Sequence, residues 1–297
     1  MSTTAVDRPH RGTIHLEDAE VLAHDAWPGN QYVLRVRAPE CAARAEPGSF
    51  VHLRCDPLLP MRRPLSIMRV DRDAGWVEFL YKTHGYGLTL LSRRRPGDTL
   101  SVLGPIGVPF TPDPARPRAL LLGGGVGIPP MLFLAEALAA AGGAGPKPLV
   151  LMGSELPFPF TLATAPAAVT GMPDDATAAL ATLETLAIPS RLASRAGLDG
   201  CHDGFVTDLA RRWLDTLSAA QRDEVAVYTC GPTPMLEAVA RLAADYALPC
   251  QVSLEEYMAC AVGGCAGCAV RVQTPEGPAM KRVCVDGPVF DARSVFA

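Results

Sequence analysis

The cysteines near the carboxyl terminus constrain the fold of this chain more than any other feature. Cys260, Cys265 and Cys268 lie close together in sequence, and Cys284 follows them. A Cys-x4-Cys-x2-Cys segment with a later fourth cysteine has the spacing of a plant-type two-iron, two-sulfur centre. Glycines between the first three cysteines permit positive φ, so the backbone can turn its N–H groups toward the sulfurs. We therefore expect these four thiolates to hold a 2Fe-2S cluster.

Two other uses of the thiols stay open from spacing alone. Structural zinc is usually held by two Cys-x2-Cys pairs, whereas the first gap here is four residues and Cys284 has no cysteine near it in sequence. Thiols that bind no metal are the other alternative. The segment 251–297 is rich in glycine and cysteine and has little apolar periodicity, and a segment of this size needs a metal or a similar staple to fold. We expect it to form a small C-terminal 2Fe-2S domain.

The remaining sequence indicates a globular protein without nucleic-acid or membrane partners. Of its 297 residues, 48% are hydrophobic and 20% charged, which is enough apolar surface for further domains. The formal net charge of -4 offers no basic surface to nucleic acid or anionic lipid. Glycines and Pro129-Pro130 interrupt the apolar stretch 119–146, which disfavours a membrane-spanning helix. The first residues contain no apolar signal segment, so we expect a cytoplasmic protein with reduced thiols.

Residues 1–111 predict an antiparallel β-barrel. Segments 31–37, 48–54 and 76–81 have the character of short strands with turn residues between them, and apolar positions alternate in 31–37. Three prolines between residues 111 and 117 cannot continue a ladder, and they mark the end of this domain.

Residues 112–250 predict a Rossmann-like parallel α/β domain, because short apolar segments alternate with helical ones. The stretch 154–189 is the exception and has no readable pattern. The predicted strands are 119–122, 148–152 and 224–229, and the predicted helices are 129–141, 206–217 and 234–246.

A glycine-rich turn follows the first predicted strand of this domain. Gly123, Gly124, Gly125 and Gly127 precede a predicted helix, whose free N–H groups and dipole would stabilise a phosphate. The turn departs from the standard dinucleotide fingerprint, because Pro130 stands in the place of the third glycine. Nucleotide binding and a purely structural turn both fit this segment.

Two further motifs are ambiguous by themselves. Cys230-Gly231-Pro232 ends a predicted strand at the edge where open α/β sheets bind ligands, but it also fits a buried thiol before a turn. Arg62–Ser66 places an arginine and a serine hydroxyl around a rigid proline, which suits a phosphate, although surface arginines are usually only solvated. Gly85-Tyr86-Gly87 fits a simple hairpin turn.

In this order, the motifs resemble those of the ferredoxin-reductase-like flavoproteins. The chain resembles more closely the electron-transfer subunits of the two-subunit, NAD-linked dihydroorotate dehydrogenases, and the segments 253–260 and 281–290 are the most specific pieces of the resemblance. The resemblance covers nearly the whole chain. It implies FAD on the barrel (1–111), NAD or NADP on the α/β domain (112–250) and a 2Fe-2S cluster on the tail (251–297).

The resemblance also implies a function and a partner. An FMN-containing dehydrogenase catalytic subunit would oxidise dihydroorotate in pyrimidine biosynthesis, and this chain would pass the electrons to NAD+, in a heterotetramer with two copies of each subunit. Two alternatives stay open: a subunit of another NAD(P)H:ferredoxin or sulfide-linked oxidoreductase, and a zinc-stapled nucleotide-binding module without electron transfer.

Site residues follow from the resemblance by position. The family commonly has Gly-Thr where this chain has Gly87-Leu88, so phosphate binding would rest on the Gly87 N–H, Thr89 or Arg63. Cys230 would lie near the nicotinamide. The implied FAD-binding residues are Arg63, Pro64, Leu65, Ser66, Leu80, Tyr81, Lys82, Gly87 and Leu88, and the implied nucleotide-binding residues are Gly123, Gly124, Gly125, Gly127, Gly231 and Pro232.

Overall fold

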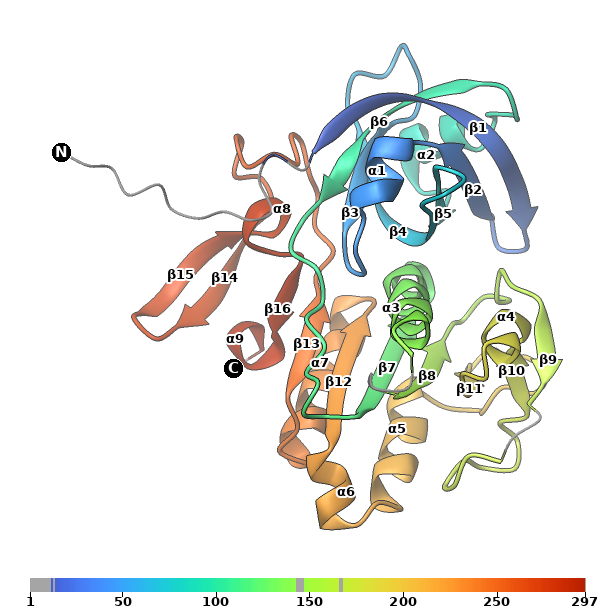
Figure 1. Ribbon diagram of the computed structural model, residues 1–297, viewed down its shortest axis with the longest axis vertical. Helices are drawn as coiled ribbons and strands as arrows, with labels where there is room; N and C mark the ends of the chain where they lie inside the picture. Colours follow the sequence, from blue (N-terminus) through green and yellow to red (C-terminus); the bar gives the residue numbers. More distant parts are fainter. Residues whose placement is uncertain (1–11, 13, 143–146, 166–167, 297) are drawn as a thin grey trace.

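The computed structural model describes residues 12, 14–142, 147–165 and 168–296. A β-barrel and an α/β sheet lie one above the other, and a β-hairpin stands beside them (Figure 1). The predicted fold class is therefore confirmed. No helix within the described ranges is long and apolar enough to cross a membrane.

The barrel closes through antiparallel pairs in the order β1-β2-β5-β4-β3-β6. Side chains such as Leu34, Val36 and Phe79 lie in the interior. Burial alternates over part of β2, as expected for a pleated strand with one face toward a core, whereas residues 77–81 of β5 are all buried. Its elements are β1 (His15–Trp27), β2 (Gln31–Arg37), α1 (Pro39–Arg44), β3 (Phe50–Arg54), β4 (Arg63–Asp71), β5 (Trp76–Lys82), α2 (Gly85–Leu91) and β6 (Thr99–Ile106).

The sheet below the barrel has the order β11-β8-β7-β12-β13-β16, and all its pairs are parallel except the last. The continuous apolar run of its central strands reflects burial on both faces. Its elements are β7 (Arg118–Gly124), η1 (Gly125–Gly127), α3 (Ile128–Ala140), β8 (Lys147–Gly153), β11 (Ser190–Ala193), α5 (Val206–Asp215), α6 (Ala219–Asp223), β12 (Val225–Cys230), α7 (Thr233–Asp245) and β13 (Cys250–Ser253).

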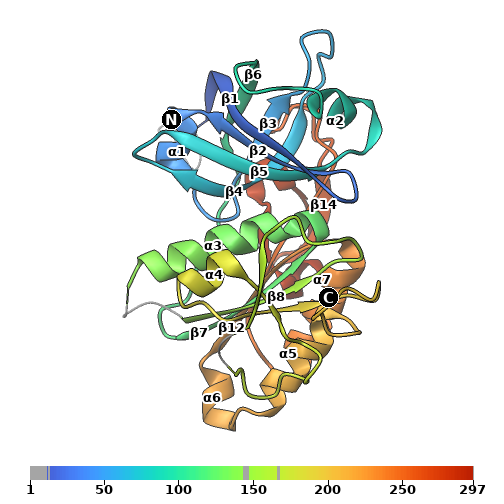
Figure 2. The same cartoon turned by 90° about the vertical axis from the view of Figure 1, so that its right-hand side faces the viewer.

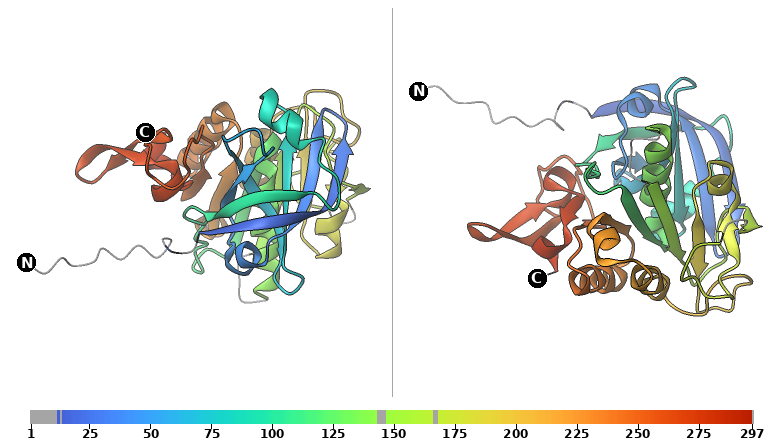
Figure 3. Two further views of the ribbon diagram at one scale, coloured as in Figure 1. Left: turned by 90° about the horizontal axis from the view of Figure 1, so that it is seen from above. Right: turned by 60° about the horizontal axis from the view of Figure 1, so that its bottom comes forward.

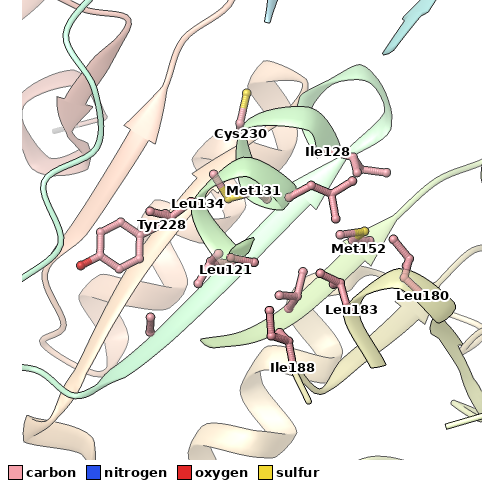
Figure 4. Packing of buried hydrophobic residues seen from close by; sticks show 14 of the residues in the cluster. Leu121, Ile128, Met131, Leu134, Met152, Leu180, Leu183, Ile188, Tyr228 and Cys230 are labelled. Atoms are coloured by element: carbon pink, nitrogen blue, oxygen red, sulfur yellow. The ribbon is translucent and has the colours of Figure 1, made fainter. Parts of the chain in front are cut away.

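Helix α3 separates the barrel from the sheet, while α5 and α6 lie on the opposite face of the sheet (Figure 2). Arg69 of the barrel donates from Nε to Glu136 of α3 at 2.6 Å, so the two domains are joined by an ion pair as well as by packing. Figure 4 shows the core between α3 and the sheet, with Met131 and Leu134 of the helix close to Leu121 and Tyr228 of the strands.

The stretch that had no readable pattern forms a small subdomain at one edge of the sheet. β9 (Leu162–Thr164) pairs with β10 (Ala178–Leu180), and α4 (Ala181–Thr185) follows. Leu180, Leu183 and Ile188 complete the core shown in Figure 4.

The tail consists of the hairpin β14 (Ala269–Thr274) and β15 (Gly277–Arg282), followed by α8 (Val283–Asp286), β16 (Val289–Asp291) and α9 (Ala292–Val295). The hairpin projects from the rest of the molecule in both views of Figure 3. β16 returns to pair with β13, so the tail also completes the large sheet.

Candidate functional site

The four tail cysteines come from a loop and from the helix that follows the hairpin. Cys260, Cys265 and Cys268 lie on the loop before β14, and Cys284 lies in α8. Val283 N–H donates to the Cys268 carbonyl at 3.0 Å, and this bond holds α8 against the loop. The structure thus places the predicted ligands in one region.

Backbone N–H groups of the loop point at the sulfurs, as the glycines predicted. Gly264 and Cys265 donate to Cys260 Sγ at 3.3 and 3.4 Å, and Gly267 donates to Cys265 Sγ at 3.4 Å. Burial raises the pKa of Cys260, but hydrogen bonds from Val262, Cys265 and Gly264 outweigh it and lower the pKa to about 7. The loop therefore favours thiolate, the form that binds metal.

The thiols contact each other in two pairs. Cys260 is hydrogen-bonded to the Cys265 side chain, while burial and then the hydrogen bond and charge of Cys268 raise the pKa of Cys284 to about 12. In the described ranges, no three His, Cys, Asp or Glu side chains converge on one point as a single metal ion requires. Two pairs of cysteine thiols suit a centre with two irons.

The cysteine loop packs directly on the barrel. Phe50 of β3 and Ile106 of β6 form one buried cluster with Ala261, Cys268 and Cys284. The tail thus obtains from the barrel part of the core that its own sequence lacks.

The barrel opens between β4 and β5, on the side where the motif Arg63–Ser66 lies. The ladder between these strands runs from Asp71–Trp76 to Ile67–Phe79. Beyond it, Arg63–Ser66 pairs with β3 only and Leu80–Lys82 with β2 only. Backbone groups on the two facing edges are consequently available to a flat ligand with hydrogen-bonding groups along its rim.

The side chains of the β5 segment differ in what they face. Leu80 belongs to the same buried cluster as Ile128 and Cys230 of the α/β domain. Tyr81 points into the barrel, where its ring stacks on Tyr32 at 5.3 Å. Burial raises the pKa of Tyr81 well above its usual value, so its hydroxyl stays protonated and its backbone is the part that can face a ligand.

Arg63 and Gly87 meet beside this opening. A side chain at Gly87 would come within 3.1 Å of the Arg63 guanidinium, so glycine lets the two approach. Arg63 Nη1 donates to the carbonyls of Met61 and Arg62, while its Nε and Nη2 have no protein acceptor within the described ranges. The Thr89 hydroxyl donates to the Gly85 carbonyl at 3.0 Å, so Arg63 and the Gly87 N–H are the free donors for a phosphate.

The glycine-rich turn of the sheet lies against the Cys-Gly-Pro turn. A Cβ at Gly127 would be 2.5 Å from the carbonyl group of Cys230 and from Gly231 N, so only glycine fits there. Gly125 has a φ of 54°, in the left-handed region that glycine adopts without strain. η1 also lies beside β5, so the turn faces the barrel opening.

Two residues near Cys230 were missed by the motif analysis. Burial raises the pKa of the Cys230 thiol well above its usual range, the Glu255 charge raises it further, and a hydrogen bond with Ser253 opposes this. Glu255 is exposed to solvent, yet the protein packed around its carboxyl raises the pKa of that group through desolvation. The sequence contained a sign of both residues, because they lie in the segment 253–260, one of the most specific pieces of the family resemblance. The structure places this segment at the carboxyl end of β13.

Comparison with known proteins decides the family. Residues 255–296 match the iron–sulfur cluster binding domain of dihydroorotate dehydrogenase B. The chain is 36% identical to the dihydroorotate dehydrogenase B (NAD+) electron transfer subunit of Geobacillus sp. (strain WCH70), over 94% of this chain and 98% of that protein. The chain belongs to the family of dihydroorotate dehydrogenase B electron-transfer subunits. Its similarity to the Desulforamulus reducens subunit is 32% identity over 94% of this chain and 97% of that one.

Membership in the dihydroorotate dehydrogenase B family makes this chain an oxidoreductase subunit for electron transport in pyrimidine biosynthesis. Its cluster-binding domain and reductase fold support iron–sulfur and flavin cofactors.

Solved structures agree on the fold. The chain is similar to a structure described as the NADH-dependent reduced ferredoxin-NADP oxidoreductase, with a TM-score of 0.75 and 24% identity over 94% of this chain and 90% of that one. It is also similar to phthalate dioxygenase reductase, with a TM-score of 0.57 and 15% identity over 90% of this chain and 76% of that one.

Proposed function

We propose that this subunit carries electrons between a dihydroorotate-oxidising partner and a nicotinamide nucleotide. Three sites converge on the barrel, and this observation carries the proposal. The barrel itself has the opening between β4 and β5, the cysteine loop packs on β3 and β6, and the glycine-rich turn lies beside β5. Oxidation of dihydroorotate to orotate releases two electrons and two protons, and NAD+ takes up two electrons and one proton as a hydride. Flavin supplies the exchange between single electrons and hydride.

The 2Fe-2S site consists of Cys260, Cys265, Cys268 and Cys284. The match of residues 255–296 to an iron–sulfur cluster binding domain supports this assignment over zinc, and the two thiol pairs and the N–H donors of Gly264 and Gly267 agree with it. The N–H donors compensate negative charge on the sulfurs, so they stabilise the reduced form of the centre.

FAD is assigned to the barrel opening. The facing edges of Arg63–Ser66 and Leu80–Lys82 bind the isoalloxazine through backbone groups, and Arg63 with the Gly87 N–H binds the pyrophosphate. Leu88 stands where the family commonly has threonine, and its side chain packs against the barrel core. It therefore helps to position this segment but gives the pyrophosphate no hydrogen bond.

The nicotinamide nucleotide is assigned to the carboxyl edge of the sheet. Gly123, Gly124, Gly125 and Gly127 bind its phosphates through N–H groups, and Gly231 and Pro232 shape the adjacent turn. Cys230 stays a thiol because burial raises its pKa, so it acts as a small neutral group beside the nicotinamide.

The domain limits that we propose are 1–111, 112–250 and 251–297, for FAD, nucleotide and cluster respectively. The partner is an FMN-containing catalytic subunit, with two copies of each chain in the complex. Tyr257 precedes the cysteine loop and Val262 lies within it. They are 87% and 48% exposed and offer the partner an apolar contact.

Purification of the chain alone and with coexpressed dehydrogenases tests the proposal. We expect the absorbance of a flavin, and iron and acid-labile sulfide in a ratio of one to one. We also expect copurification with the subunit that oxidises dihydroorotate. A colourless zinc protein would overturn the electron-transfer function. Copurification with a ferredoxin-linked or sulfide-linked oxidoreductase, without dihydroorotate oxidation, would instead assign the partner to the alternative class.

A further inference from the structure

Arg69 of β4 joins the barrel to the α/β domain through its guanidinium. Its Nε donates to Glu136 Oε1 of α3 at 2.6 Å, and its Nη2 donates to the Thr182 hydroxyl of α4 at 3.3 Å. Its Nη1 donates to Glu78 of β5 at 3.4 Å. One side chain of the barrel therefore has polar contacts with two helices of the α/β domain, and Figure 2 shows both helices beneath β4 and β5.

A β-bulge in β4 turns Arg69 toward α3. Ile67 pairs with Phe79 in the ladder with β5. The next pair joins Arg69 to Glu78, so β4 has one residue more than β5 at this point. Bulges of this kind re-aim the side chains of the bulged strand. The extra residue, Met68, belongs to the apolar cluster of α3, so it faces the helix together with Arg69.

The ion pairs around Arg69 are largely shielded from solvent. The Glu78 side chain is 7% exposed, and those of Arg69 and Glu136 are 18% and 25% exposed. Arg35 of β2 also pairs with Glu78, at 2.8 Å. The cost of removing charges from water offsets much of their attraction, so such pairs add little stability compared with apolar residues. Stability alone therefore does not account for the network.

The contact between Arg69 and Glu136 lies between the two proposed cofactor sites. Glu136 is about 12 Å along the helix axis from Ile128, where α3 follows the glycine-rich turn. Arg69 is about 10 Å along β4 from Ser66, the last residue of the proposed FAD motif. A rotation of α3 by about 5° around the ion pair would therefore move the glycine-rich turn by about 1 Å.

We propose that Arg69 is a positioning residue for hydride transfer, because it holds α3 and the glycine-rich turn at the distance from the barrel at which nicotinamide and flavin react. The inference rests on the proposed flavin and nucleotide sites. Apolar packing of α3 on the barrel is non-directional, whereas hydrogen bonds from one planar guanidinium fix the helix in rotation as well as in distance.

The reaction that Arg69 serves is sensitive to such a displacement. A hydride, which is two electrons and one proton, leaves the reduced nicotinamide and is taken up by the oxidised flavin, or moves in the opposite direction. A misplacement of about 1 Å can lower the rate of such a step by about 100-fold. The rotation of about 5° that the ion pair prevents is large enough to have this effect.

Arg35 provides a matched control for the stability of the barrel. It binds the same carboxylate, Glu78, through Nε and Nη2 at 3.1 and 2.8 Å, and its guanidinium lies 4.0 Å from the centroid of the Trp76 ring. Both of these partners belong to β5 of the barrel. A variant of Arg35 thus loses an ion pair of Glu78 and keeps the contact with α3.

The test follows the reduction of bound flavin by NADH in the anaerobic holoenzyme. In Arg69→Met we expect the rate constant at saturating NADH to fall by about 10- to 100-fold, while the Kd of NADH stays within about twofold and the flavin and iron contents stay unchanged. The long-wavelength charge-transfer absorbance of the nicotinamide–flavin pair should weaken too, because it requires stacked rings. Glu136→Ala removes the same contact from the helix and should lower the rate constant by about 10-fold. Arg35→Met should change neither the rate constant nor the absorbance.

The outcomes separate this inference from the proposed function. An unchanged rate constant and charge-transfer absorbance in both Arg69→Met and Glu136→Ala overturn the positioning role, and an equal loss in Arg35→Met also overturns it. If Arg69→Met does not fold, Glu136→Ala decides: a lower rate constant supports the role and an unchanged one overturns it. No reduction of the wild-type flavin by NADH overturns the proposed function itself.

Discussion

Substitution of Gly127 by alanine tests the contact between the two turns of the nucleotide site. The added Cβ would lie 2.5 Å from the backbone of Cys230 and Gly231, whereas ordinary contact begins near 3.4 Å. The turns must therefore separate by about 1 Å. Backbone atoms cannot rotate away as a side chain can, so we expect a cost near the upper end of the range for overpacked sites, about 3 kcal/mol.

The displacement should also weaken nucleotide use. A shift of about 1 Å in a positioning element can cost about 100-fold in rate, so kcat/KM for the nicotinamide nucleotide should fall by about this factor. Guanidinium denaturation followed by far-UV circular dichroism reports the stability of the α/β domain, and steady-state kinetics report the site.

Gly153→Ala is the matched control, since it changes a glycine at the same edge of the sheet. Its Cβ would lie 3.5 Å from the Val206 side chain, an ordinary contact. Both variants gain the same small stabilisation from a stiffer unfolded chain, about 0.4–1 kcal/mol, so their difference isolates the clash. Equal stability and equal kcat/KM in the two variants would refute the reasoning.

Four further changes have expected outcomes. Cys265→Ser should remove most of the iron in elemental analysis, whereas Cys250→Ala, which changes a buried thiol outside the loop, should retain it; equal iron in both would contradict the ligand assignment. Arg282→Lys removes the 2.8 Å bond from Nη1 to the Gly263 carbonyl but keeps the charge, so the loop should release iron faster to a chelator, and an unchanged release rate would argue against this anchor. Arg63→Ala should weaken FAD binding by about 10- to 100-fold through loss of a charged contact, as fluorescence titration would measure; retained affinity would move the pyrophosphate elsewhere. Burial raises the pKa of Cys55 from 9.0 to about 11, so the unfolded state ionises first and this thiol's contribution to stability should fall as pH rises from about 9 to 11; thiol labelling of the folded protein that is already complete at pH 8 would contradict it.

The sequence was informative where the determining pattern is local. Short apolar segments such as 31–37 and 76–81, separated by turn residues, predicted the barrel, because a strand's pleat depends only on its own residues. The cysteine spacing predicted the loop in the same way. The order of β11, β8 and β7 in the sheet, by contrast, depends on contacts between distant segments, and a periodic pattern does not encode it.

Site residues were missed for the same reason, because contacts between distant segments bring them together. Glu255 approaches Cys230 because β13 pairs with β12. β9, β10 and α4 escaped prediction since each is only a few residues long and is held by tertiary packing, so no helical or strand period could develop.

The shared core of the cysteine loop and the barrel affects how the protein is made. Phe50 and Ile106 are buried by Ala261, Cys268 and Cys284, so a chain synthesised without iron would leave apolar barrel surface uncovered until the loop closes. Loss of the cluster would then expose apolar barrel surface, so iron supply would affect the stability of the whole subunit as well as its redox chemistry.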